Sequence, residues 1–277
     1  MLIQFITMFF NKITESESNY KHLEKMSVNQ LLTHINNEDQ TVAKSVQMII
    51  PEIEKTVNAI VQQLNKGGRL FYIGAGTSGR IGVLDASECP PTFGVPYDLV
   101  IALIAGGDTA IRKAVENAED NQAQAIEDLS TYDINSNDFL IGIAASGTTP
   151  YVLGGVDYCK NQQIPTAGIT CNPGSPLTTK VDFPLVAVVG PEFVTGSSRM
   201  KAGTAQKMIL NMISTAVMIR LGRVKGNKMV DMKLSNDKLI NRAERMLIEE
   251  LKIDNQQAKK LIEKYGNVRN ALLNYKR

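Results

Sequence analysis

Glycine and hydroxyl residues gather in the stretch IGAGTSGRIGVLDASECPP, at residues 73–91. The apolar run before it predicts a buried strand, and the residues after the turn can begin a helix. Thr77 and Ser78, flanked by Gly76 and Gly79, would then place two hydroxyl donors at a helix N-terminus. Backbone N–H groups and the helix dipole favour an anion there, and this combination suits a phosphate monoester. A plain structural turn remains an alternative interpretation of the glycines.

The same glycines satisfy the G-x-G-x-x-G pattern of dinucleotide-binding folds. That interpretation requires an acidic residue at the end of the second strand, roughly 20 residues on, to bind the ribose. Asp108 comes 29 residues after Gly79, which is too late for a comfortable match. The stretch therefore favours a phosphate group over a dinucleotide.

A second hydroxyl-rich loop follows another apolar run, in FLIGIAASGTTP at residues 139–150. Its final proline is well placed to begin a helix. Two such loops after two strands of one sheet can close around a single phosphate, so the pair is more specific than either loop alone. The candidate phosphate-binding residues of this loop are Ser146, Gly147, Thr148 and Thr149.

A third cluster, VTGSSRMKAGTAQK at residues 194–207, precedes a long apolar helix. Ser197 or Ser198 could simply cap that helix. Arg199 and Lys201 would lie near its first turn, where the helix dipole disfavours positive charge. Cations in this position invite an anion, so Ser198, Arg199 and Lys201 are further candidate ligands of an anionic substrate.

Carboxylates are the candidate acids and bases, because the two histidines, His22 and His34, are far in sequence from every loop. The sequence therefore argues against a Ser-His-Asp triad and a histidine-rich metal site. Pro90 and Pro91 should end a helix just after Glu88, which would place that carboxylate beside the first loop. The other candidates are Asp85, which would share the helix face of Glu88, and Glu119 and Asp120, whose run could equally be a solvated helix face.

The three cysteines are scattered and form no C-x-x-C pair, which argues against a disulfide framework or a zinc site. We interpret Cys89, Cys159 and Cys171 as small buried side chains, with Cys89 a weak candidate nucleophile beside a carboxylate. The pattern is typical of a reducing compartment. No metal site is expected.

The composition and net charge limit the classes of binding partner that the protein is expected to have. The 277 residues carry a net charge of +2 from 30 basic and 28 acidic side chains. No basic stripe is present, so nucleic acid is not an expected partner. The apolar start MLIQFITMFF is too short to span a bilayer and lacks the features of a signal peptide. We therefore expect a cytoplasmic protein without membrane segments.

Five short apolar runs alternate with helical stretches, which predicts an α/β fold with a doubly wound parallel sheet. Ligands in such folds bind beyond the carboxyl ends of the strands. A helix is predicted over 41–64, with a kink or junction at Pro51, and a buried helix over 201–221. We expect an N-terminal helical segment (1–40), a sheet domain (41–234) and a small helical appendage (235–277). The predicted strands are 69–73, 99–105, 139–145, 166–170 and 184–189.

Taken together, the loops resemble the SIS (sugar isomerase) phosphosugar-binding domain. Five strings resemble, more narrowly, the N-acetylmuramic acid 6-phosphate etherase family, in order from about residue 13 to the appendage. The start of the chain does not match, and the appendage resembles the small helical domain of the family but ends early. The strings are GAGTSGRIGVLDASECPPTFG, IAGGDTAIRKAVENAEDN, GIAASGTTPYVLGG, CNPGSPL and VTGSSRMKAGTAQKMILNM.

The resemblance implies cleavage of the D-lactyl ether of N-acetylmuramic acid 6-phosphate, giving N-acetylglucosamine 6-phosphate and D-lactate. It implies elimination followed by addition of water, without a metal or organic cofactor, in a homodimer. Glu88 would be the acid that protonates the leaving group, and Glu119, with Asp120 close behind, the second carboxylate. Two alternatives stay open: an aldose–ketose sugar-phosphate isomerase, and a non-enzymatic sugar-phosphate sensor.

Overall fold

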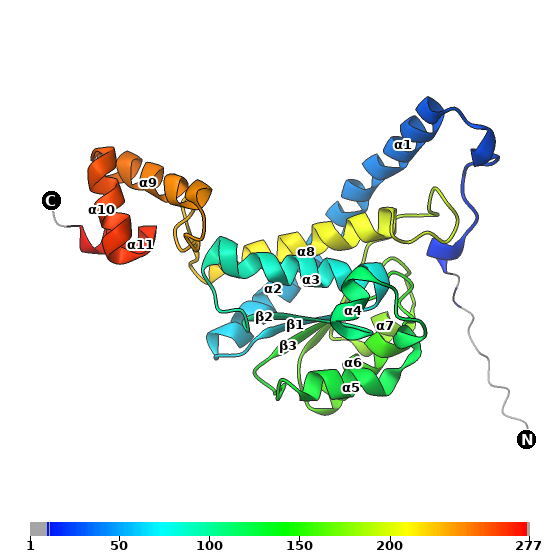
Figure 1. Cartoon of the computed structure of the whole chain (residues 1–277). Helices are drawn as coiled ribbons and strands as arrows, with labels where there is room; N and C mark the ends of the chain where they lie inside the picture. The colour runs from blue at the N-terminus through cyan, green and yellow to red at the C-terminus, as the bar shows by residue number, and fades with distance from the viewer. Residues whose placement is uncertain (1–9, 11, 276–277) are drawn as a thin grey trace, which may run out of the picture.

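The computed structural model describes residue 10 and residues 12–275. Five parallel strands form the central sheet in the order β2-β1-β3-β4-β5 (Figure 1). Each strand lies within a few residues of a predicted apolar run, so the predicted doubly wound sheet is confirmed. The strands are β1 (Leu70–Gly74), β2 (Val100–Ile104), β3 (Phe139–Ile143), β4 (Thr166–Thr170) and β5 (Phe183–Val186).

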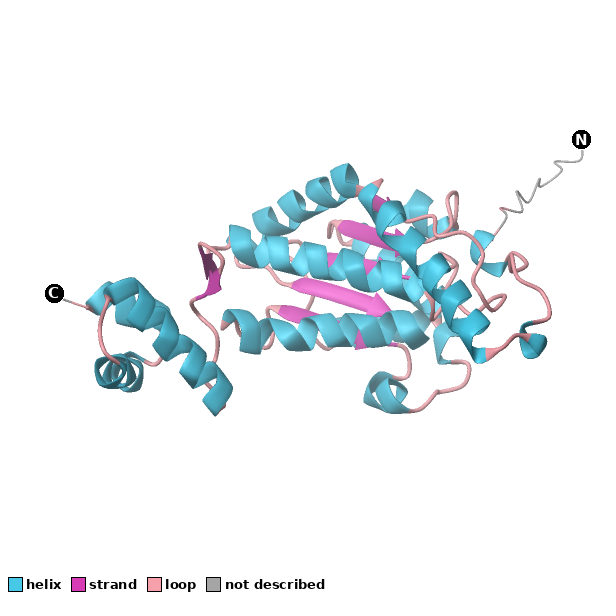
Figure 2. Ribbon diagram, turned by 90° about the horizontal axis from the view of Figure 1, so that it is seen from above, coloured by secondary structure: helices cyan, strands magenta, loops and turns pink. Residues whose placement is uncertain are grey.

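Helices cover both faces of this sheet (Figure 1), and Figure 2 shows one of the two helical layers from above. In β1, Leu70 and Tyr72 pack into one buried cluster, whereas Phe71 and Ile73 pack into the other. Successive side chains of a strand point to opposite faces, so covering both faces produces the continuous apolar runs of the sequence. One face carries α2 (Ile50–Asn65), α3 (Gly76–Phe93) and α8 (Lys201–Arg220); the other carries α5 (Gln122–Ser130), α6 (Pro150–Asn161) and α7 (Pro176–Lys180).

The predicted helix over 41–64 is divided between two helices, as Pro51 suggested. The first, α1 (Val28–Gln47), begins at a capping box formed by Ser27 and Gln30. The second, α2, begins at Ile50, with Pro51 in its first turn. Proline is tolerated there because its missing N–H would have no partner within the helix.

The N-terminal segment is fastened to a part of the chain that comes much later in the sequence. Near the short 3₁₀ turn Ile13–Glu15, the Thr14 hydroxyl accepts a hydrogen bond from the buried Asn172 amide at 2.9 Å. The Ser18 hydroxyl donates to the Phe193 carbonyl at 2.7 Å. A second 3₁₀ turn, Leu23–Lys25, leads into α1. The prediction made for MLIQFITMFF falls almost entirely outside the described residues.

Three short helices follow the sheet domain, which confirms the predicted helical appendage (Figure 1). They share a separate hydrophobic cluster with Val230 and Met232, which precede them. A small unpredicted hairpin precedes them. No helix in the described part of the chain is long and apolar enough to cross a membrane. These elements are β6 (Val224–Lys225), β7 (Lys228–Met229), α9 (Asp237–Leu251), α10 (Asn255–Tyr265) and α11 (Val268–Asn274).

The prediction that Pro90 and Pro91 end the helix is wrong. Helix α3 continues through both prolines to Phe93 and ends at Gly94, which has φ +64°. Prolines in this last turn remove two helical hydrogen bonds. Burial of Pro90 and Phe93, and a hydrogen bond from the Gly94 N–H to the Pro90 carbonyl at 3.0 Å, hold the turn in place.

Candidate functional site

The carboxyl ends of β1 and β3 form the crevice in which a doubly wound sheet normally binds its ligand. The chain passes from β1 to β2 on one side and then crosses to β3 on the other, so the strand order reverses here. Gly74 at the end of β1 is paired with Ile143 at the end of β3. The two hydroxyl-rich loops start from these paired positions, and the structure therefore brings them together.

The glycine spacing of the first loop follows from how closely β1 and α3 approach. Gly76 has φ +52°, a conformation that disfavours side chains. A Cβ atom on Gly79 would lie 2.5 Å from Ile104 Cγ1 and 2.8 Å from the Gly74 carbonyl oxygen. The G-x-G-x-x-G pattern is therefore accounted for by backbone geometry, without a dinucleotide.

The hydroxyls of the first loop lie in the first turn of α3. Thr77 is half-buried and Ser78 is 8% exposed. The Ser78 hydroxyl donates to Oε1 of Gln206 on α8 at 2.9 Å. The N-terminal N–H groups of α3 and these hydroxyls make this end of the helix suited to an anion.

In the second loop, Ser146 is the centre of a small hydrogen-bond network. Its Oγ accepts from the Thr148 hydroxyl at 2.9 Å and from the Thr148 N–H at 3.2 Å, which leaves its own proton for an outside acceptor. Gly147 has φ +69°, and a Cβ there would lie 2.1 Å from Ser175 Oγ. Thr149 precedes α6 without capping it through its side chain.

The serines of the third cluster do not have the helix-capping role considered for them. Neither Ser197 nor Ser198 caps α8. The fully buried Glu192 does so, accepting from the N–H groups of Lys201 at 2.8 Å and Ala202 at 2.9 Å. A carboxylate is a better partner for a helix N-terminus than a hydroxyl, because it also compensates the dipole.

The two candidate cations of this cluster have different surroundings. Arg199 is exposed, whereas Lys201 is 2% exposed and forms an ion pair with Glu38 of α1. Burial alone would raise the pKa of Glu38, but the hydrogen bond and charge of Lys201 hold the pKa below its usual value. In this structure the anion that Lys201 meets is therefore a side chain of the same protein.

A cavity of about 210 Å³ connects the first loop with the second candidate carboxylate. Gly76 and Arg80 of α3 line one side, and Glu119 lines the other, in the 3₁₀ turn Ala118–Asp120 that follows α4 (Gly107–Arg112). The Arg80 side chain donates to the Ile111 carbonyl at 2.9 Å. Asp120 is exposed and does not line the cavity.

Glu88 lies far from this cavity within one chain. It is 12 residues beyond Gly76 on the same helix, which corresponds to about 18 Å along the helix axis. Glu88 is exposed, whereas Asp85 is 8% exposed and bound by the hydroxyls of Tyr72 at 3.0 Å and Ser214 at 3.1 Å. The two carboxylates are three residues apart on α3 and so share a helix face as expected, but within one chain the helix carries Glu88 away from the first loop instead of placing it beside the loop.

Comparison with known proteins identifies the family. The chain is 62% identical over 259 residues to an N-acetylmuramic acid 6-phosphate etherase of Christiangramia forsetii, covering 94% of each chain. It is 59% identical over 270 residues to one of Bacteroides thetaiotaomicron, covering 98% of each chain. The chain belongs to the N-acetylmuramic acid 6-phosphate etherase family. The resemblance found in the sequence is thereby confirmed.

Two further comparisons agree with this membership at the level of the fold. A family model described as the glucokinase regulatory protein N-terminal SIS domain matches residues 52–160. A phosphoheptose isomerase from Francisella tularensis superposes with a TM-score of 0.52 at 20% identity, covering 69% of this chain and 98% of its own. One from Neisseria gonorrhoeae gives 0.53 at 15% identity, covering 68% and 97%.

Three side chains near the loops of this etherase family member were missed in the sequence. Arg80 lies four residues after Gly76, so helical spacing could have placed it at the cavity. Glu192 and Gln206 reach their partners only through the tertiary fold, and no local pattern indicates them. They lie nine residues before and five residues after Lys201.

The cysteines are all buried and unpaired, as expected for small core side chains. Burial, followed by the charges of Asp85 and Glu88, raises the pKa of Cys89 to about 12. A thiol in this state is a poor nucleophile, so Cys89 is not suited to the nucleophilic role considered for it. The described residues contain no cluster of histidine, cysteine and carboxylate groups that could hold a metal ion.

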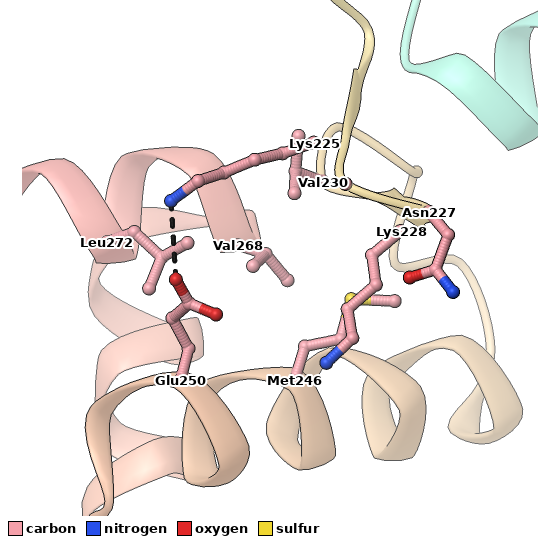
Figure 3. A pocket seen from close by; sticks show the side chains of 9 residues that line it. Lys225, Asn227, Lys228, Val230, Met246, Glu250, Val268 and Leu272 are labelled. Carbon is pink, nitrogen blue, oxygen red and sulfur yellow. Dashed lines mark hydrogen bonds and ion pairs between the residues drawn. The ribbon is translucent and has the colours of Figure 1, made fainter.

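A second cavity, of about 280 Å³, lies in the C-terminal part of the chain between the β6–β7 hairpin and helices α9 and α11 (Figure 3). Its two lysines are already paired, Lys225 with Glu250 at 3.4 Å and Lys228 with Glu249 at 2.5 Å. None of the predicted site residues lines this cavity.

Proposed function

We propose that this protein is a carbon–oxygen lyase that cleaves the D-lactyl ether of N-acetylmuramic acid 6-phosphate. The products are N-acetylglucosamine 6-phosphate and D-lactate, in amino-sugar catabolism and cell-wall recycling. The observation that carries the proposal is the identity to etherases along nearly the whole chain. The two hydroxyl-rich loops at the strand-order reversal support it, because they suit a sugar phosphate.

The phosphate binds, in this proposal, between the first turn of α3 and the second loop. The donors are the N-terminal N–H groups of α3 and the hydroxyls of both loops. Gly76, Gly79 and Gly147 allow the tight packing and the left-handed backbone of the two loops that present these donors. The hydroxyl donors are Thr77, Ser78, Ser146, Thr148 and Thr149, with Ser198, Arg199 and Lys201 as further polar groups beside the site.

Glu119 acts as the general base and Glu88 as the general acid. Elimination across C2 and C3 of the open-chain sugar requires a base for the C2 proton and an acid for the lactate oxygen. Glu119, which lines the cavity beside the first loop, takes the C2 proton as the C3–O bond breaks. Glu88 gives its proton to the departing lactate. Water then adds, with hydroxyl at C3 and hydrogen at C2.

The position of Glu88 supports a homodimer with the site near the subunit boundary. Within one chain Glu88 lies about 18 Å from Gly76 along the helix axis, and a second copy can supply this carboxylate instead. Leu84, one turn before Glu88, is 49% exposed, and Val28 and Leu32 of α1 are 71% and 63% exposed. Exposed apolar residues on two helices are typical of a covered interface.

The lactate-release assay tests the reaction. Incubation with N-acetylmuramic acid 6-phosphate should release D-lactate. Formation of a ketose phosphate from an amino-sugar phosphate, without lactate, would favour an isomerase. Tight binding without turnover would favour a sugar-phosphate sensor.

Site-directed variants test the two carboxylates. Glu88→Ala and Glu119→Gln should each lower kcat by about 10²–10⁴-fold, the usual contribution of one acid–base group. They should leave the fold and N-acetylglucosamine 6-phosphate binding largely intact. Asp120→Asn is the matched control and should change kcat by less than about threefold, a bound we set well below the effect of a general base. Normal turnover in Glu88→Ala would remove Glu88 from the mechanism.

Subunit mixing tests the shared site. When the inactive Glu88→Ala and Glu119→Gln proteins are unfolded together and refolded, half of the random dimers pair one subunit of each kind. Each such dimer contains one site with both carboxylates, so about a quarter of the wild-type activity should return. No recovery, while each protein refolds as a dimer, would contradict a site built from two subunits.

We also propose the division into residues 1–40, 41–234 and 235–277, and a cytoplasmic localisation. Three unpaired cysteines support a reducing compartment. The separate hydrophobic cluster of the last three helices also includes Val230 and Met232, so it supports a boundary a few residues before the second one. Limited proteolysis and cell fractionation test these two points.

A further inference from the structure

The side chain of Gln206 is buried against the first loop, and its NH₂ group makes no hydrogen bond within the described residues. It is 1% exposed, and its Oε1 accepts the Ser78 hydroxyl at 2.9 Å. Its Nε2 has no hydrogen-bond partner in the described part of the chain. Burying an amide donor without an acceptor is costly, so an apolar side chain would serve a purely structural position better.

A glycine, Gly203, allows α8 to pack closely against this loop. Gly203, one turn before Gln206, faces the loop, and a Cβ added there would lie 3.3 Å from Thr77 Cγ2. Residues three apart share a helix face, so Gly203 brings α8 close enough for the Gln206 amide to reach Ser78. The contact joins the two helices that flank the proposed phosphate position.

We infer that Gln206 is a positioning residue that sets the Ser78 hydroxyl for the substrate phosphate. This inference rests on the proposed function, because it assumes a phosphate at the first loop. Without a phosphate, the Ser78 hydroxyl donates to Oε1, as the structure shows. With a phosphate, the hydroxyl turns to the anion, and the amide rotates so that Nε2 donates to Ser78 Oγ.

A glutamine amide is suited to both states because it carries a donor and an acceptor of nearly the same shape. In the bound state Ser78 accepts from Nε2 while it donates to the phosphate, and hydrogen bonds in such chains strengthen one another. A carboxylate at position 206 could only accept. It would hold the Ser78 proton away from the anion and add like charge. A methionine would leave the hydroxyl without a partner.

The test measures binding and turnover separately. The dissociation constant of N-acetylglucosamine 6-phosphate is measured by titration calorimetry, and KM and kcat by lactate release. Gln206→Met should weaken product binding and raise KM by roughly 10- to 100-fold, as expected for a hydrogen bond to a charged group. Its kcat should change by less than about threefold, because Gln206 touches no reacting atom. Gln206→Glu, which has nearly the same shape, should weaken binding at least as much.

A double-mutant cycle separates positioning from a structural role. In the Ser78→Ala background, Gln206→Met should cause no further loss of product binding, because Gln206 acts through Ser78. The matched control is Gln63→Met. This second buried glutamine donates to the Ser136 carbonyl at 3.0 Å, away from both loops. Gln63→Met should lower thermal stability without changing product binding.

Three results would overturn the inference. The first is an equal loss of product affinity from Gln206→Met in the wild-type and Ser78→Ala backgrounds. The second is unchanged product binding in Gln206→Glu. The third is the absence of product binding by the wild-type protein. If the wild-type protein binds N-acetylglucosamine 6-phosphate but releases no lactate, the proposed reaction fails alone. The product-binding measurements of the double-mutant cycle still decide the role of Gln206.

Discussion

Replacing the buried Glu192 by glutamine should loosen the start of α8. The carboxylate accepts from two backbone N–H groups, those of Lys201 and Ala202. In Glu192→Gln one oxygen remains, while the new NH₂ group faces an N–H that it cannot accept from. A hydrogen bond to a charged group contributes about 1.5–3 kcal/mol, so we expect a loss of about 2–3 kcal/mol in the free energy of unfolding.

Two measurements check this loss. Scanning calorimetry should show Tm lowered by roughly 4–12 °C, at 2–4 °C per kcal/mol for chains near this size. Hydrogen exchange should accelerate in the peptide that spans residues 194–207. Glu54→Gln, on an exposed position of α2, is the matched control and should stay within about 0.5 kcal/mol of wild type. A Glu192→Gln protein with control-like Tm and exchange would refute the capping role.

Three further outcomes follow from burial. Gly79→Ala should lower the free energy of unfolding by about 1–3 kcal/mol, because its Cβ would meet Ile104 Cγ1 at 2.5 Å; an unchanged urea midpoint would contradict this. Burial raises the pKa of Asp85 above its ordinary value, so the folded state holds this proton more tightly than the unfolded state. Its stabilising contribution should be complete below the ordinary pKa and decline as pH rises through the raised pKa; Tm measured against pH should show a smaller decline for Asp85→Asn. The three buried cysteines should resist iodoacetamide at pH 8 in the native protein and react after unfolding; rapid native labelling would show that they are accessible.

Local patterns predicted most of the fold. The apolar runs placed all five strands, and Pro51 marked the junction between α1 and α2, because these signals act within a few residues. Pro90 and Pro91 misled because burial of the last turn of α3 outweighs the hydrogen bonds that prolines remove. Tertiary packing of this kind has no local signature.

The candidate site shows the same limit. Spacing predicted the two hydroxyl-rich loops, because both directly follow buried strands. It could not reveal that Glu192, rather than a neighbouring serine, caps α8. The distance of about 18 Å between Gly76 and Glu88 follows from twelve residues on one helix, so spacing could have shown it once α3 was taken as a continuous helix.

The attachment of the N-terminal segment has a consequence for synthesis on the ribosome. Glu38 is paired with Lys201, 163 residues later in the chain, and Thr14 is bound to Asn172. At 5–20 residues per second, these partners emerge roughly 10–30 s after the segment itself. The segment is therefore made well before its partners and is among the last parts to dock, and its apolar side chains stay available to chaperones throughout that interval.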